Sequence, residues 1–496
     1  MSHIRVTYSG LISFAIGLTS VITGLVFTLI VTRQLSQEEF GTWSLIGSLI
    51  SYVLFVEPVI SYWTLREIAR GGKSGATAIF SSGLFSVGAI IVYLVIAILM
   101  GNQTGVDYNI LIFSLILIPV IFLNKTLSVI NNAWKPEATS YGLIVFELAK
   151  IPVGLVLVYF LQMGLYGAII ATAVAYIASN IALAIFARKK IRGKFQISII
   201  KKWLKKFWIP VFPSLSGLIL NLDVAIFAII TGSVEGIALF GVSITITGII
   251  AHTNVISNAI YPKLLGGGKT QIVQQNMIRF LYFAVPITAL TIVFAKPALF
   301  ALNPIYEVAQ WIVFFMAFKV FLTYFTTIFT RPMMGLEKVD TIEQSTYKDY
   351  IKSALFKIPS IRFIHNIIYL STFTIVIWII FVNGASQVDL VIYWTIIAII
   401  IHIPLTIYYY KLSRKDIQLN FDSSIIKYIL VSMGVFSFMY ILMDKFLIYQ
   451  ESIFDFLPDL VLYVLLASTL YLSITFFIDN KTKNLFVSIY KEIRGK

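Results

Sequence analysis

The sequence predicts an all-α, polytopic membrane protein of about 14 transmembrane helices, arranged as two parallel six-helix lobes plus a C-terminal helical hairpin. Three observations predict this class: a very apolar composition, apolar runs of membrane-spanning length, and a one-sided distribution of Lys and Arg. Of the 496 residues, 58% are hydrophobic and only 12% are charged, whereas soluble globular domains carry about 25% charged residues. A soluble fold is therefore excluded.

The apolar runs are about 20 residues long, which is the length of helix that crosses the hydrocarbon core of a bilayer. Each run is expected to be helical, because backbone polar groups in lipid must be satisfied within their own segment. The expected spans are residues 9–32, 41–64, 78–100, 109–130, 140–161, 165–186, 207–230, 237–260, 280–295, 309–330, 363–382, 389–410, 428–443 and 459–478.

The distribution of basic residues sets the orientation of these spans. With the N-terminus inside, the inward loops hold 33 of the 38 Lys and Arg, and the outward loops hold only Arg33, Lys296 and Lys445. Lys150 and Lys319 remain within the bilayer. Positive charge on the cytoplasmic side is the known rule for membrane proteins. We therefore expect a multi-pass protein of the cell (plasma or cytoplasmic) membrane with both termini in the cytoplasm.

Two further features narrow the function. The chain has no cysteine, so thiol nucleophiles, disulfides and zinc-thiolate or iron–sulfur sites are excluded. The first apolar run, Leu11 to Val31, is longer than a signal-peptide core and is expected to be a retained helix. The net charge of +15 lies in inward loops, so it indicates topology, and no nucleic-acid partner is expected.

Short repeated stretches predict the two lobes. Phe40-Gly41 and Phe240-Gly241 stand 200 residues apart, each at the start of the helix after an outward loop, and the inward loops carry GGKS at 71–74 and GGKT at 267–270. Six helices per half would make the halves parallel repeats. The expected divisions are an N-terminal lobe at 1–190 (TM1–6), a basic cytoplasmic linker at 191–206, a C-terminal lobe at 207–412 (TM7–12), and a hairpin (TM13–14) with a basic tail at 413–496.

The two GGK stretches do not form a nucleotide site. A P-loop needs a glycine five positions before its second glycine, and Glu67 and Lys263 stand there. No ATP-hydrolysing site that could drive transport is predicted.

Five charged side chains fall inside the spans and away from their ends: Glu57, Glu147, Lys150, Asp223 and Lys319. A lone charge at the centre of a membrane helix costs about 2.5 to 3.5 kcal/mol, so such residues usually face a bundle interior or a water-filled cavity. Glu147 and Lys150 are three residues apart and can pair on one helix face. The pair is either part of a transport cavity or an interior ion pair that locks helices 5 and 6.

The other charges stand beside helix-bending residues or without a nearby partner. Glu57 precedes Pro58, a predicted kink, and Arg66 follows at the inner mouth. Asp223 follows Asn221 in a helix that we expect Pro210 and Pro213 to bend toward a cavity.

A polar face of the eighth helix, formed by His252, Asn254 and Asn258, is expected to line the same cavity. Lys319 has no acid within a helical turn, so it needs either a partner on another helix or a cavity. No metal site is predicted.

The opening of the chain, LIVTRQLSQEEFGTWSLIGSL followed by FVEPVISYWTLREIARGG, resembles the polysaccharide (O-antigen type) flippases of the multidrug/oligosaccharidyl-lipid/polysaccharide (MOP) exporter superfamily. The likeness covers nearly the whole chain as topology and about the first 75 residues as motif. The matching positions are Leu35, Ser36, Phe40 and Gly41, then Glu57, Arg66, Ile68 and Ala69. Two departures weaken the transfer of residue roles: Val59 replaces the usual Gly, and the inward loop Arg331 to Arg362, with an amphipathic stretch, is longer than in the family.

The resemblance implies a flippase that moves a lipid-linked oligosaccharide, on a polyprenyl or dolichyl phosphate or pyrophosphate, to the outer leaflet by alternating access of the two lobes. Surface polysaccharide or glycoprotein glycans would be assembled from that cargo, in contact with membrane lipids and with glycan-assembly machinery. Lys150, Lys319 and Arg66 would bind the phosphate or sugar. Glu57, Glu147 and Asp223 would hold those cations or bind a coupling H⁺ or Na⁺, and no other cofactor is expected.

Three alternatives stay open. A cation-coupled multidrug exporter of the same superfamily would present unpaired carboxylates to its cargo, and a flippase of the peptidoglycan precursor would carry another lipid-linked sugar. A multi-span glycosyltransferase or polymerase is less favoured, because the longest outward loops have only about 15 residues. The sequence leaves open which sugar and lipid carrier are moved, the coupling ion, a bacterial or archaeal source, the oligomeric state and the role of the 331–362 loop.

Overall fold

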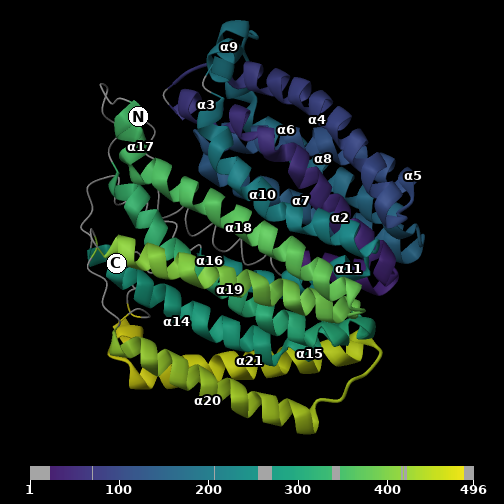
Figure 1. Cartoon of the computed structure of the whole chain (residues 1–496), viewed down its shortest axis with the longest axis vertical. Coiled ribbons are helices and arrows are strands. Elements are labelled where there is room, and N and C mark those ends of the chain that lie inside the picture. Colours follow the sequence, from purple (N-terminus) through teal and green to yellow (C-terminus); the bar gives the residue numbers. More distant parts are fainter. Residues whose placement is uncertain are drawn as a thin grey trace. The chain divides into compact units, whose positions relative to one another are not determined.

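A computed structural model of the chain describes eight stretches, residues 23–69, 71–205, 207–254, 271–337, 347–414, 417, 422–484 and 487. Every regular element in these stretches is a helix (Figure 1). Twelve of the helical segments are long and apolar enough to cross a membrane. The predicted all-α membrane fold is confirmed.

The twelve spanning helices account for twelve of the fourteen predicted spans. Of the predicted first span, 9–32, residues 23–32 are helical, and residues 1–22 lie outside the described part. Of the predicted eighth span, 237–260, the structure describes the apolar helix α11 (Glu235–Ala251) and the turn His252–Asn254. The count of fourteen therefore stays a prediction.

The chain forms two compact units, each described separately. Unit 1 comprises residues 1–241 and 361–390, and unit 2 comprises residues 242–360 and 391–496. The lobe boundaries at 190, 206 and 412 stay a prediction.

Unit 1 is built from helical residues 23–34 and from the following elements. These are α2 (Gln37–Val53), a 3₁₀ turn (Leu54–Val56), α3 (Pro58–Ala69), α4 (Gly75–Thr104), α5 (Tyr108–Phe113), a 3₁₀ turn (Ser114–Ile116), α6 (Leu117–Asn132), α7 (Pro136–Gly154), a π-helical segment (Leu155–Phe160), α8 (Gly164–Ile191), α9 (Ile197–Lys205) and α10 (Trp208–Thr231). The start of α11, most of α18 (Ala354–Val382) and the first residues of α19 (Gln387–Ser413) complete it.

Side-chain amides join α6 to α8 in unit 1, and of these Asn131 and Asn180 are buried and Asn124 is half-buried. Asn124 donates to Ser179 and Asn180, each at 3.0 Å, and Asn131 donates to the backbone oxygen of Leu183 at 2.9 Å. Polar side chains on facing membrane helices hydrogen-bond to one another because hydrocarbon offers no other partner. This polar seam gives unit 1 a rigid frame on which α7 also packs.

Proline shapes two helices of unit 1. The predicted kink at Pro58 is present: α2 ends at Val53, and a 3₁₀ turn leads through Glu57 into α3. Pro152 lies inside α7, and the helix continues from Leu155 with π-helical hydrogen bonds. Proline lacks a backbone N–H and removes one rung of the ladder, which explains the change of helical pitch after it.

The repeated Phe-Gly stretches approach closely within unit 1. A Cβ added at Gly41 would lie 2.2 Å from the backbone oxygen of Val234, and one at Gly241 would lie 2.5 Å from Oγ of Ser44. Side chains larger than hydrogen would force the start of α2 away from the segment that leads into α11. The glycines of the repeat are therefore needed for close helix packing.

The linker helix α9 is fixed to unit 1 at its predicted cytoplasmic end. Trp203 is buried, and its indole N–H donates to Glu67 of α3 at 3.2 Å. The ammonium of Lys202 lies 3.6 Å from the same carboxylate. The basic run at 188–206 therefore contains one helix whose apolar face packs on the bundle and whose lysines stay exposed.

Unit 2 is built from the rest of α11 with the 3₁₀ turn His252–Asn254, α14 (Gln271–Val293), α15 (Ala295–Leu302), a 3₁₀ segment (Pro304–Ala309), α16 (Gln310–Leu336), α17 (Tyr347–Lys352), the first turns of α18, most of α19, α20 (Ser423–Phe446) and α21 (Ile453–Ile478). The hairpin α20–α21 packs on α14 through a core that includes Tyr282, Tyr428 and Tyr471. In Figure 1 the hairpin is the yellow pair at the end of the chain.

The inward loop that the sequence places at 331–362 is mostly helical. Helix α16 continues to Leu336, α17 occupies Tyr347–Lys352, and α18 begins at Ala354. Residues 338–346 lie outside the described part. The amphipathic stretch that the sequence places in this loop, residues 341–358, includes α17 and the first turn of α18 in its described part.

Candidate functional site

The ammonium group of Lys150 lies over two aromatic rings. Its Nζ is 4.0 Å from the ring centroid of Phe27, in the helix 23–34, and 5.3 Å from that of Phe146, one turn earlier on α7. Stacking on rings stabilises a desolvated cation by about 2 kcal/mol. The position of Phe27 depends on Gly154, where a Cβ would lie 2.7 Å from the Phe27 ring.

Glu147 is buried beside this cation and acts on it electrostatically. Its charge also acts on Tyr176 of α8, whose ring lies 4.6 Å from that of Phe146. We call Phe27, Phe146, Glu147, Lys150 and Tyr176 the cation cluster. Glu147 and Lys150 act on each other electrostatically, and their predicted ion pair stays a prediction. The aromatic partners from two other helices were not foreseen.

Glu57 lies at the kink between α2 and α3, where only 5% of its surface is exposed. Its carboxylate accepts a hydrogen bond from Ser61, one turn on. The positive charge of Lys125, on α6, also acts on it. Sequence reasoning missed Lys125, because it stands near the end of its span and was counted with the inward loop.

Asp223 lies on α10 between two tyrosines. The hydroxyl of Tyr369, from α18, donates to its carboxylate at 2.7 Å, and Tyr52, from α2, donates to the backbone oxygen of Asn221 at 2.5 Å. The side chain of Asn221 is exposed, whereas Asp223 is 5% exposed. Two tyrosine hydroxyls, one from α2 and one from α18, thus hold α10 near Asp223. We use the name acid cluster for the two buried carboxylates of unit 1, Glu57 and Asp223, together with the residues around Asp223, which are Tyr52, Asn221 and Tyr369.

A second contact joins α10 to α18 about two turns before Asp223. The amide of Asn366 donates to the backbone oxygen of Ser216 at 2.6 Å, and His365 Nδ1 lies 2.9 Å from the Asn366 side-chain oxygen. Pro213 lies inside α10, which runs without interruption from Trp208 to Thr231, and the predicted bend stays a prediction. Sequence reasoning missed this contact, although two adjacent polar residues, His365 and Asn366, stand inside an apolar run there.

Arg66 lies in the last turn of α3, and its guanidinium stacks on the ring of Tyr62 at 4.5 Å. The side chain is half-buried. A cation in the last turn also interacts favourably with the helix dipole. Arg66 is therefore held near the predicted cytoplasmic end of α3.

Lys319 belongs to unit 2, where it is half-buried on α16 within a row of phenylalanines. A polar group that the sequence reasoning missed lies two turns further along. His402 Nε2, on α19, lies 3.1 Å from Oγ1 of Thr326, which is 2.7 Å from Oγ1 of Thr406. A lone histidine two residues before Pro404 was the available signal.

The predicted polar face on the eighth helix is described only in part. His252 is half-buried in the 3₁₀ turn that ends α11. For Asn254 the structure describes only the backbone, and Asn258 lies outside the described residues. Among the described residues no group of three or more His, Asp or Glu could hold a metal ion.

The geometry of unit 1 separates two chemical environments. The cation cluster offers a fixed ammonium that can attract an anion. The acid cluster offers two buried carboxylates, and Asp223 has tyrosine hydroxyls beside it. Such carboxylates can hold a cation or a proton. Intramembrane charges of this kind are typical of transport pathways.

The sequence matches no protein-family model and no curated protein significantly. The fold, however, matches solved structures. A multidrug resistance MATE family transporter of the MOP superfamily, in an inward-facing conformation, aligns at a TM-score of 0.57 and 14% identity, over 82% of this chain and 98% of that one.

Two further structures show the same fold. A MOP superfamily transporter from Pyrococcus furiosus, for which a reversed polarity of the binding pocket is said to suggest a different function, aligns at a TM-score of 0.55 and 15% identity, over 83% of this chain and 95% of that one. A MATE transporter in complex with MaD3S aligns at 0.54 and 14% identity, over the same shares. This chain therefore has the fold of the MATE transporters of the MOP superfamily.

Proposed function

We propose that this chain is a membrane transporter, not an enzyme, that flips a lipid-linked oligosaccharide outward through alternating access of its two lobes. The observation that supports this cargo best is the ammonium of Lys150, stacked on Phe27 and Phe146 inside a spanning helix. A cation kept at this depth suits the phosphate or pyrophosphate of such a lipid. The fold of the solved transporters supports the class of function.

The chemistry of the cargo explains why several kinds of side chain are needed. The sugar cannot cross hydrocarbon, the phosphate needs a cation, and the lipid tail can stay in the bilayer. Lys150 and Lys319 would contact the anion, and Arg66 would attract it at the cytoplasmic end. Glu57, Glu147 and Asp223 would hold these cations or bind a coupling H⁺ or Na⁺.

The test is a flipping assay in proteoliposomes with a fluorescent, polyprenyl-pyrophosphate-linked oligosaccharide and a membrane-impermeant quencher. Because Lys150→Gln removes a charge-assisted contact to the anion, we expect it to slow flipping about tenfold. Lys150→Arg should retain most of the rate. The matched control is Lys445→Gln, which removes an exposed lysine beyond the end of the apolar run of α20.

Two measurements keep this test decisive if Lys150→Gln does not fold. Size-exclusion profiles and unfolding temperatures show whether each variant is intact. The wild-type protein should also fail to move the same oligosaccharide on an uncharged polyprenol. Equal flipping of the charged and uncharged cargo would contradict the proposal.

A second candidate, a cation-coupled multidrug exporter, is supported more directly by the solved structures, which include a multidrug resistance transporter. The acid cluster also fits it, since buried carboxylates attract organic cations. In this case ethidium efflux from proteoliposomes should follow a Na⁺ or H⁺ gradient. Glu57→Gln and Asp223→Asn should abolish that efflux, while Lys150→Gln should leave it unchanged.

The same assay also distinguishes between two lipid-linked sugars, the oligosaccharide and the peptidoglycan precursor. Proteoliposomes that contain a peptidoglycan precursor instead of the oligosaccharide test the related flippase activity. Flipping of that lipid at a higher rate than the oligosaccharide would change the assigned cargo without changing the role of Lys150.

A further inference from the structure

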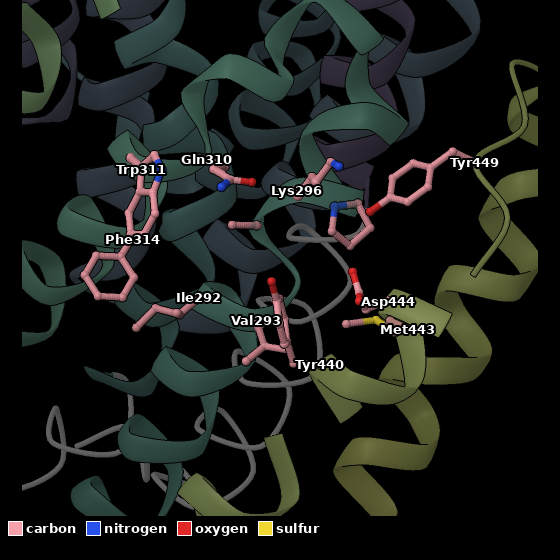
Figure 2. Close-up of a pocket in the computed structure, with 12 residues that line it drawn as sticks. Ile292, Val293, Lys296, Gln310, Trp311, Phe314, Tyr440, Met443, Asp444 and Tyr449 are labelled. Atoms are coloured by element: carbon pink, nitrogen blue, oxygen red, sulfur yellow. The ribbon is translucent and has the colours of Figure 1, made fainter. Parts of the chain in front are cut away.

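A pocket of about 420 Å³ lies in unit 2 at the ends of three helices. It is bordered by the end of α14, the start of α16 and the end of α20, with α15 and the loop after α20 (Figure 2). The charge distribution places all of these ends at the outer face of the membrane. Its volume lies within the range of small-ligand sites.

The apolar part of the pocket suits an acyl chain. Ile292 and Val293 from α14 lie with Trp311 and Phe314 from α16, whose rings meet edge to face at 5.6 Å. Trp311 is 54% exposed. Exposed tryptophan at the end of a spanning helix is typical of the level where acyl chains meet headgroups. The pocket therefore lies at headgroup depth.

The opposite wall is aromatic and is held in place by packing. The ring of Tyr449 stacks on that of Phe456 at 5.5 Å and meets the ring of Phe300 edge to face at 5.0 Å. Tyr440 lines the pocket beside it and is 58% exposed. These rings offer π faces to a ligand cation.

The polar groups of the pocket carry both signs of charge. Lys296 is exposed, and its ammonium lies 3.9 Å from Glu307 and 5.2 Å from the Tyr449 ring. Asp444 is exposed at the end of α20 and forms no ion pair or hydrogen bond within the described stretches. Figure 2 shows the ends of Lys296 and Asp444 near Tyr449, with Trp311 and Phe314 on the other side.

The raised pKa of Tyr449 indicates that its hydroxyl is partly buried and lies near negative charge. This residue lies in the loop after α20, where burial, together with the negative charges of Glu307 and Asp444, raises the pKa of its hydroxyl to about 12. An excess of negative potential beside aromatic rings favours an ammonium group at this wall.

We propose that this pocket binds the headgroup of an amine-bearing phospholipid of the outer leaflet, such as phosphatidylethanolamine. The primary ammonium donates to Asp444 and lies against Tyr440 and Tyr449. Lys296 and the side-chain N–H groups of Gln310 and Trp311 contact the phosphate, and one acyl chain lies along Ile292 and Phe314. This site is separate from the cation and acid clusters and does not depend on the cargo.

The distribution of charges selects this lipid among the common ones. Phosphatidylglycerol offers the same phosphate to Lys296, but it has no cation for Asp444. Phosphatidylcholine has a quaternary ammonium, which stacks on rings but has no N–H to donate to a carboxylate. A primary amine satisfies both the carboxylate and the rings.

Native mass spectrometry of the full chain from mixed nanodiscs tests the proposal. With equal amounts of phosphatidylethanolamine, phosphatidylcholine and phosphatidylglycerol, we expect the first to be retained about fivefold over the others. Asp444→Asn should remove this preference while phospholipid is still retained. Lys296→Gln should lower the retention of all three. Lys445→Gln, next in sequence but absent from the pocket lining, is the matched control.

If a variant does not fold, the retention of the three lipids by the wild-type protein still tests the proposal. Equal retention of the three lipids, or preference for phosphatidylcholine, would overturn the proposal, the latter because rings alone would then select the ligand. An unchanged preference in folded Asp444→Asn would overturn it as well.

Discussion

Asp479 in unit 2 and Glu57 in unit 1 are both buried carboxylates, 3% and 5% exposed, yet their surroundings differ. Asp479 accepts hydrogen bonds from Tyr428 at 2.9 Å, Ser424 at 3.0 Å, and both the backbone N–H and the hydroxyl of Thr482 at 3.0 Å. Glu57 accepts one, from Ser61, within the described residues.

The difference teaches how to separate structural from functional acids in a membrane protein. The lone pairs of Asp479 are largely occupied, and Lys427 lies 3.7 Å away. Burial would raise the pKa of the Asp479 carboxyl, but the hydrogen bonds from Tyr428, Thr482 and Ser424 hold it below the ordinary value. Such an acid fixes the hairpin and has little capacity for a ligand. Glu57 keeps acceptor capacity for an ion or a proton.

The largest effect is expected from Asp479→Ala. This change leaves the partners of the carboxylate unsatisfied, so we expect the free energy of unfolding to fall by about 3 kcal/mol or more. Thermal unfolding in detergent measures the effect. Asp459→Asn, an exposed acid on the same helix, is the control and should change little. Equal stability of the two variants would show that the network around Asp479 does not hold the hairpin.

Glu57→Gln should have the opposite effect, with little change in stability and a large loss of transport. Because it keeps the shape of the side chain and its hydrogen bond with Ser61, we expect it to change the free energy of unfolding by less than about 1 kcal/mol. Transport in the proteoliposome assay should fall at least about tenfold. Ser61→Ala, which removes the hydrogen bond but keeps the charge, should retain most of the transport. A stable Glu57→Gln variant with normal transport would remove Glu57 from the proposed site.

The smallest effect on stability is expected at the ion pair between Asp422 and Lys481, which lies beside Asp479. The hydrogen bonds from Lys481 and the Ser424 N–H lower the pKa of the Asp422 carboxyl from 3.8 to about 2. A lowered folded-state pKa stabilises the protein fully above about pH 4, and the contribution is lost as the pH falls through about 2. The difference in unfolding temperature between wild type and Lys481→Gln should therefore be small at pH 6, shrink as the pH falls from about 4 to about 2, and vanish below that. A difference independent of pH would exclude this pair as its source.

Much of the fold could be predicted because the relevant signals are local. The kink at Pro58 follows from the missing N–H of one residue, and the spans follow from runs of apolar side chains. The repeated Phe-Gly stretches predicted two lobes, which stays a prediction, and the close contacts made by Gly41 and Gly241 were not foreseen.

The site could be predicted only as a set of charged positions. Lys150 was found because a cation is rare in an apolar run, but its partner Phe27 lies more than 100 residues earlier. Tyr369, which donates to Asp223, lies 146 residues later and resembles many other tyrosines of the spans. Asp479 was missed because it stands just past the end of a span, where an acid is ordinary.

The sequence alone determined the membrane class, the positions of the spanning helices and the rarity of charge within them. These properties depend on each segment by itself, because a helix in hydrocarbon must satisfy its own backbone and present apolar side chains along its whole length. Only the tertiary structure decided which buried charges have many partners and which have few. Those partners come from helices distant in sequence, so no local pattern specifies them.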